Sequence, residues 1–94
     1  MLLLTKSPNR AKKWRITGPK YIVDFGAKGY SDYTMHKDKE RKERYIIRHR
    51  ARENWSDPRT AGFWSRWLLW EKPSLSQAIL FVSRKLKQTI RQVR

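Results

Sequence analysis

The clearest pattern of apolar and polar positions lies at the C-terminal end of the chain. Six apolar residues recur there at steps of 4, 3, 4, 4 and 3: Leu75, Ile79, Val82, Leu86, Ile90 and Val93. This spacing puts all six on one face of a helix about five turns long. Ser74-Leu75-Ser76-Gln77 matches a capping box, in which the serine and glutamine side chains bond to each other's free backbone N–H groups. The pattern therefore predicts that the last helix begins at Ser74.

The middle of the chain predicts a longer and more polar helix, from about Thr34 to Glu53. Residues 37–53 are strong helix formers, with carboxylates four residues before cations. The inward-facing positions are few, namely Met35, Tyr45, Ile46 and His49. Most of this helix is expected to be solvated or ion-paired, as in a strut, and Pro58 ends the segment that follows it.

A third, short helix is expected from Phe63 to Glu71, with aromatic side chains on nearly every side. Residues 5–13 show no periodicity and predict an extended arm that orders only on a partner. Apolar and polar residues alternate over 14–16 and 21–25, which predicts a short hairpin, followed by a flexible joint at 26–29. The predicted fold is mainly α, with about three helices.

The predicted organisation is an extended basic N-terminal arm with short strands, residues 1–28, and a small helical domain, residues 29–94. Apolar residues make up 38% of the 94 residues and charged residues 33%. This apolar fraction is below the 45 to 50% that is usual in globular domains, and a chain of this length buries a modest core. We therefore expect partner contacts to complete the fold.

Positive charge dominates the chain, with 23 Lys and Arg against 8 Asp and Glu, a formal net charge of +15. The excess is +6 over residues 1–30, +2 over 31–57 and +7 over 58–94, so the two ends are basic. Nucleic acid, acidic membranes and acidic protein surfaces are the candidate partners. The predicted basic surface consists of Lys6, Arg10, Lys12, Lys13, Arg15, Arg84, Lys85, Lys87, Arg91 and Arg94.

Four of the five tryptophans lie within 16 residues, and three alternatives are open for them. They can form the protein's own core. They can anchor a partner, because buried Trp and Arg dominate interface hot spots. They can also stack on the bases of single-stranded nucleic acid. The predicted partner-binding residues are Trp55, Phe63, Trp64, Arg66, Trp67 and Trp70.

No catalytic, metal or cofactor motif emerges from the residues. His36 and His49 have no cysteine and no suitably spaced third ligand. Asp38, Glu40 and Glu43 alternate with cations, which keep carboxylates ionised on a solvated helix face. We expect no enzymatic activity, no cofactor, no metal site and no small-molecule substrate.

Residues 29–80 resemble a family of short basic, tryptophan-rich proteins encoded by large double-stranded DNA viruses of eukaryotes. The stretches that carry the resemblance include Gly29-Tyr30-Ser31-Asp32-Tyr33-Thr34, Arg52-Glu53-Asn54-Trp55, Thr60-Ala61-Gly62-Phe63-Trp64-Ser65-Arg66-Trp67-Leu68-Leu69-Trp70 and Lys72-Pro73-Ser74-Leu75. The link Ser56-Asp57-Pro58-Arg59 is shorter than the family pattern, which puts its loop geometry in doubt. The first 28 residues lie outside the resemblance.

The resemblance implies a non-enzymatic structural protein of the virion. We expect a minor capsid protein that bridges or cements major capsid capsomers from the inner face of the shell, with host cytoplasm as its place of assembly. Its expected partners are the major capsid protein and other minor capsid proteins, with acidic membrane or nucleic acid as further candidates for the basic termini. The alternative is a non-specific nucleic-acid-binding virion protein associated with the genome.

Overall fold

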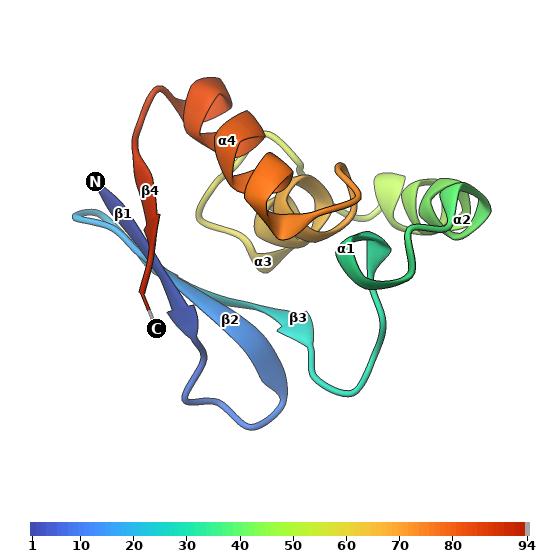
Figure 1. Cartoon of the computed structure of the whole chain (residues 1–94), viewed down its shortest axis with the longest axis horizontal. Helices are drawn as coiled ribbons and strands as arrows, with labels where there is room; N and C mark the ends of the chain where they lie inside the picture. The colour runs from blue at the N-terminus through green and yellow to red at the C-terminus, as the bar shows by residue number, and fades with distance from the viewer. Residues whose placement is uncertain (94) are drawn as a thin grey trace.

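A four-stranded mixed sheet organises the protein. In the computed structural model, which describes residues 1–93, the strands are β1 (Leu2–Lys6), β2 (Lys12–Thr17), β3 (Ile22–Ala27) and β4 (Ile90–Gln92), and their order is β3-β2-β1-β4. Neighbours β1, β2 and β3 run antiparallel, whereas β4 lies parallel to β1 (Figure 1). The two ends of the chain therefore meet in one sheet.

The alternation of side chains in these strands explains why the N-terminal region is ordered. One face of the sheet carries buried apolar side chains at positions in register, such as Leu4 opposite Ile16 and Ile16 opposite Val23. The prediction of an extended arm over residues 1–28 is wrong, because these residues pair with one another and bury their apolar face against the helices. Their basic residues occupy solvent-facing positions and strand ends, so charge does not prevent folding.

Two helices stand where one was predicted between Thr34 and Glu53. The first, α1, spans Tyr33–His36, and the second, α2, spans Lys39–Arg50. Lys37 adopts a left-handed conformation (φ 58°), which ends α1, and the Asp38 carboxylate accepts from the backbone N–H groups of Glu40 and Arg41, which starts α2. Asp38 therefore caps a helix instead of continuing one.

The tryptophan-rich segment forms a short helix, α3 (Ala61–Trp64), which continues as a single π-helical turn, η1 (Ser65–Leu69). The predicted start of the last helix is confirmed, because the Ser74 side chain accepts from the backbone N–H of Gln77. Its predicted end is wrong. Helix α4 spans Leu75–Leu86, Lys87 turns the chain with φ 54°, and Ile90 enters β4, opposite Leu2.

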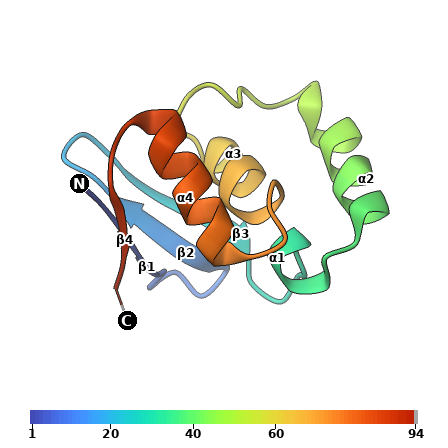
Figure 2. The ribbon, with the colours of Figure 1, turned by 45° about the horizontal axis from the view of Figure 1, so that its top comes forward.

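The helices all lie on one side of the sheet (Figure 1). α3, η1 and α4 cover it, and α2 stands to the side of this layer (Figure 2). The core between the layers holds buried side chains from the strands, α3, η1 and α4, among them Leu2, Leu4, Ile16, Phe25, Phe63, Trp64, Leu68, Ala78 and Val82. The fold is a small α/β domain, and the prediction of a mainly α fold is wrong because it assigned no packing role to the N-terminal strands.

Candidate functional site

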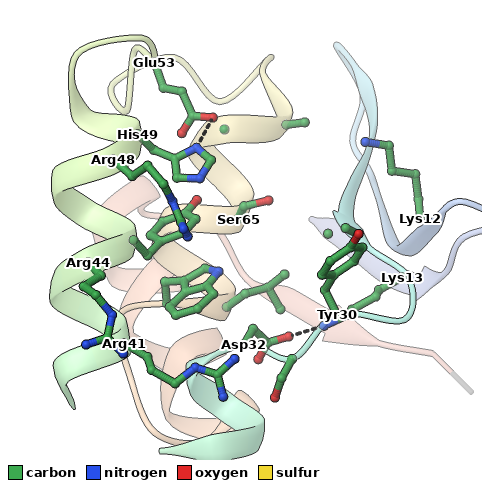
Figure 3. A pocket seen from close by; sticks show the side chains of 18 residues that line it. Lys12, Lys13, Tyr30, Asp32, Arg41, Arg44, Arg48, His49, Glu53 and Ser65 are labelled. Atoms are coloured by element: carbon green, nitrogen blue, oxygen red, sulfur yellow. Dashed lines mark hydrogen bonds and ion pairs between the residues drawn. The ribbon is translucent and has the colours of Figure 1, made fainter. Parts of the chain in front are cut away.

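A hollow of the surface lies between α2 and the ends of strands β2 and β3. It encloses about 570 Å³, and α3, η1 and Trp70 form its floor. Figure 3 shows basic side chains of α2 along one wall and Lys12 and Lys13 on the other. We call this hollow the basic cleft.

The α2 wall carries a row of arginines. Arg41, Arg44 and Arg48 are spaced by three and four residues, which places them on one helix face. Arg44 lies 4.0 Å from Glu40, in a pair whose side chains are both largely exposed. Within residues 1–93, no carboxylate lies in salt-bridge range of Arg41 or Arg48. Exposed pairs contribute little, so all three guanidinium groups can bind an anion.

The opposite wall contributes lysines from β2. Lys13 Nζ lies 2.6 Å from Asp32 Oδ2, and the Asp32 side chain is 4% exposed. Asp32 also accepts from the Thr34 backbone N–H, which caps α1. This carboxylate is therefore committed to the protein, whereas Lys12 has no ion-pair partner among the described residues.

The net charge of the basic cleft is positive. Its lining has five cations, Lys12, Lys13, Arg41, Arg44 and Arg48, and two carboxylates, Asp32 and Glu53, which leaves an excess of three with neutral histidine. Glu53 accepts from the Trp55 indole N–H at 2.8 Å and lies 3.4 Å from His49 Nδ1, so it too is engaged internally. Most of the cations that line the cleft have no strong ion-pair partner within the described residues, so they are available to an anion that enters it.

An aromatic stack holds α2 against the rest of the domain. The Tyr45 ring lies on the Trp70 ring with centroids 4.3 Å apart and an interplanar angle of 3°, and His49 covers the other face of Tyr45 at 4.4 Å. Burial raises the pKa of Tyr45, so the phenol stays neutral. Lys42, which also lies on α2, donates a hydrogen bond to the Glu71 carbonyl oxygen at 2.9 Å. These contacts fix the arginine row relative to the floor.

Two glycines in the lining of the cleft allow neighbouring side chains to pack closely against the backbone. A Cβ at Gly26 would lie 2.9 Å from Leu69 Cδ1, and Gly26 has φ 79°, a conformation that side chains disfavour. A Cβ at Gly62 would lie 3.0 Å from the Glu53 carboxyl carbon. The close approach of backbone to side chain at both positions depends on glycine.

The predicted partner-binding residues mostly pack inside the protein. Phe63 and Trp64 are 1% and 0% exposed and belong to the core, whereas Trp67 and Trp70 are partly buried against it. The Trp64 and Trp67 indole N–H groups donate to the carbonyl oxygens of Pro58 and Trp55 at 2.7 and 2.8 Å. Only Trp70 of this set lines the basic cleft.

The Arg66 side chain also makes its contacts within the protein. Its guanidinium lies 4.3 Å from the centroid of the Trp67 ring and 5.3 Å from that of Trp55, and it pairs with Glu71 at 2.7 Å. The residue is 8% exposed. Such a buried cation between two indoles ties the tryptophan segment together and presents no charge to a partner.

The predicted basic residues do not form one surface. Lys12 and Lys13 line the basic cleft, and Lys6 lies in a neighbouring hollow. Arg15 pairs with Asp24 at 2.9 Å on the sheet, and this pair lowers the pKa of Asp24. Arg10, Arg84, Lys85, Lys87 and Arg91 are exposed on other elements, and Arg94 lies outside the described residues.

The arginines that matter most in the cleft are absent from the predicted basic surface. Arg41, Arg44 and Arg48 alternate with carboxylates along the chain, which is typical of a solvated strut. Their spacing of three and four was the signal that they share a face. The wall opposite comes from strands that were predicted to be an extended arm, so nothing in the sequence placed Lys12 near α2.

The described residues give no support for a metal centre or a membrane span. Residues 1–93 contain no group of three or more histidine, cysteine or acidic side chains that could hold a metal ion. No helix in this part of the chain is long and apolar enough to cross a membrane.

A family model described as a family of unknown function (DUF5754) matches residues 2–49, which are 48 of the 94 residues. The match spans the three antiparallel strands, α1 and nearly all of α2, and it therefore includes all five cations of the basic cleft. It ends before the tryptophan-rich segment. Neither the curated proteins nor the solved structures contain a match. The resemblance to proteins of large DNA viruses stays a prediction.

Proposed function

The chain belongs to the DUF5754 family, and we propose that it is a non-enzymatic, non-specific nucleic-acid-binding protein that holds phosphates in the basic cleft. The observation that carries the proposal is the arginine row of α2 facing Lys12 and Lys13 across a hollow of about 570 Å³. A net charge of +15 adds long-range attraction for a polyanion.

The geometry of the arginine row suits a phosphodiester chain. Residues 41 to 48 span about 10 Å of helix, at a rise of 1.5 Å per residue. In a duplex, one strand presents a phosphate about every 3.4 Å of helix axis, so the row spans the axial rise of about three phosphates of such a strand. Guanidinium groups bind phosphate oxygens through two parallel hydrogen bonds, which a compact ammonium group cannot do.

The proposal gives no reason to expect sequence recognition. The cleft presents charges and the edges of stacked rings. The basic side chains of α2 lie on several faces of the helix, so α2 does not have one face of residues that could contact base edges in a groove. Contacts to phosphates position a protein but carry no sequence information. Binding is therefore expected to be salt-sensitive and nearly indifferent to base order.

The capsid proposal that follows from the sequence resemblance has a different basis. It requires exposed aromatic anchors, and Phe63 and Trp64 are inside the protein's own core. It also expected the chain to need partners for folding, whereas residues 2–27 form three strands with a complete apolar face. A place in the virion stays a prediction, and binding to capsid protein is the competing result in the experiment below.

The experiment compares two triple variants of equal net charge. One removes the arginine row, with Arg41→Gln, Arg44→Gln and Arg48→Gln; the control carries Lys20→Gln, Arg84→Gln and Arg91→Gln, at positions that are exposed and lie elsewhere. Fluorescence anisotropy measures binding to random single-stranded and duplex DNA across a salt titration. We expect the cleft variant to lose at least about tenfold in affinity and the control less than about threefold.

The salt dependence gives a second measure of the same contacts. If about four cations contact phosphates, log affinity falls against log salt with a slope of about 3 to 4 for duplex, and the cleft variant loses most of that slope. Equal losses in both triple variants would assign binding to overall charge and refute the cleft. Binding of purified major capsid protein in salt that strips DNA would favour the capsid proposal instead.

A further inference from the structure

A second basic hollow adjoins the first. It encloses about 580 Å³ and carries Lys6 and Lys28 together with Lys12 and Lys13, which line both hollows. Ser31, Asp32 and Tyr30 are also shared between the two linings. The two hollows therefore adjoin along the loop that follows β3, and Lys12 and Lys13 line both of them, with Lys6 and Lys28 in one hollow and the arginine row in the other.

Tyr30 lies at the junction of the two hollows. Its residue is 73% exposed, the most exposed of the large apolar and aromatic side chains among the described residues. Figure 3 shows it beside Lys12 and Lys13, on the side of the cleft opposite α2. No other aromatic ring within residues 1–93 packs on it.

The backbone around Tyr30 holds the ring in this exposed place. Its N–H donates to the Ala27 carbonyl oxygen at 3.3 Å, and the preceding Gly29 adopts φ 90°. The turn is therefore tied to the end of β3, and the ring stands out from it. A ring in this position is free to contact any ligand that the cations on both sides attract.

Resting on the proposed function, we infer that the ligand is single-stranded nucleic acid, with one base stacked on Tyr30 and the phosphates running through both hollows. Stacking platforms combined with a basic groove are the means by which proteins bind single strands without sequence preference, because every base has a π-face. A duplex keeps its bases paired and stacked inside, so it can use the cations but not the ring. The ring therefore gives a preference for the unpaired strand.

The experiment distinguishes contacts to the bases from contacts to the phosphate backbone of the nucleic acid. Binding of oligothymidine, of an abasic phosphodiester of the same length and of a duplex is measured for wild type, Tyr30→Ala and Tyr30→Phe. Stacking of one base corresponds to about a 5- to 150-fold change in affinity. We expect Tyr30→Ala to lose that factor on oligothymidine and almost nothing on the abasic strand or the duplex, and Tyr30→Phe to bind as wild type does.

Ile47→Ala is the matched control, because Ile47 is 68% exposed and does not line either hollow. It should change none of the three affinities. Equal losses of Tyr30→Ala on oligothymidine and abasic strand, or no loss on either, would overturn the stacking inference while the cleft could still bind DNA. Failure of wild type to bind any of the three ligands would refute the proposed function itself.

A path through both hollows has its own test. Lys6→Gln with Lys28→Gln removes cations that line only the second hollow. For oligothymidine long enough to fill both hollows we expect about a threefold to tenfold loss, and for a strand that fills only one a smaller loss. An equal loss at both lengths would show that the second hollow is not part of the path. Tighter binding of polyglutamate than of oligothymidine would overturn the choice of nucleic acid.

Discussion

The part of the molecule built from the sheet, α3, η1 and α4 differs from the part around α2 in where its large side chains and charges lie. In the first, Trp64, Phe25 and Phe63 are at most 1% exposed, and Arg66 is enclosed between indoles. In the second, Arg41, Arg44 and Arg48 are exposed, and Tyr45 is the one residue of α2 that is buried. Burial holds the first part together, whereas the second keeps its charges available to solvent.

The residues that stabilise the fold and the residues that carry the surface charge therefore lie in different parts of the chain. The tryptophan segment supplies the buried rings of Phe63 and Trp64, and the arginine helix supplies three of the five cations of the cleft. Changes in the first region should therefore act on unfolding, and changes in the second on ligand binding. Single substitutions in the two regions test this division.

Trp64→Ala should destabilise the fold most strongly of these substitutions. The side chain is completely buried, packs 6.1 Å from Phe25 between ring centroids and donates a hydrogen bond to the Pro58 carbonyl oxygen. Removal of such a side chain costs about 3 to 5 kcal/mol. Urea unfolding measures this loss; the triple arginine variant is the control and should unfold at nearly the wild-type midpoint. Equal destabilisation by both would contradict the division.

Tyr45→Ala tests the connection between the two regions. It removes the ring that lies between Trp70 and His49, at a cost of about 2 to 4 kcal/mol, and it frees α2 from the floor of the cleft. Hydrogen exchange should show faster exchange throughout α2, with smaller changes in the sheet. Ile47→Ala on the same helix should leave exchange unchanged. If amide exchange became equally faster in the sheet and in α2, this would show that α2 does not open separately from the sheet.

Asp32→Asn should lower the free energy of unfolding and raise the affinity for DNA. Asparagine still caps α1, so the change isolates the ion pair with Lys13, whose loss costs about 1.5 to 3 kcal/mol at this mostly buried site. The cleft loses one of its two carboxylates and gains a free lysine, so affinity for DNA should rise about twofold to threefold. Denaturation and anisotropy on the same samples measure both effects. A fall in affinity would mean that the pair orders the cleft.

His36 should give a small dependence of stability on pH. Burial, and then the nearby Arg41, lower its pKa against the opposing effect of Asp38 and Asp32. Because the folded pKa lies below the unfolded value of about 6.5, the unfolded chain binds the proton more readily. Stability should therefore be complete above about pH 6.5 and decline as the pH falls below it. Melting temperatures measured on either side of this pH check the decline, and His36→Gln should flatten it.

Several local features could be predicted because neighbouring residues decide them. The serine cap at Ser74, the hairpin of β2 and β3 and the early apolar stripe of α4 depend on residues a few positions apart. The end of α4 could not be predicted in the same way. Ile90 continues the helical spacing, but it gains more by pairing beside Leu2 at the other end of the chain, and no local pattern shows that partner.

The same distinction applies to the candidate site. The strongly basic character of the protein, the mostly solvated and charged surface of α2 and the clustering of the tryptophans follow from the sequence alone. Which rings belong to the core and which lie at a surface depends on the folded structure, because Trp64 and Tyr30 differ in their neighbours rather than in aromatic character. The cleft also depends on tertiary structure, since its two walls, Lys12 and Arg44, lie 32 positions apart and meet only when the sheet and α2 dock on Trp70.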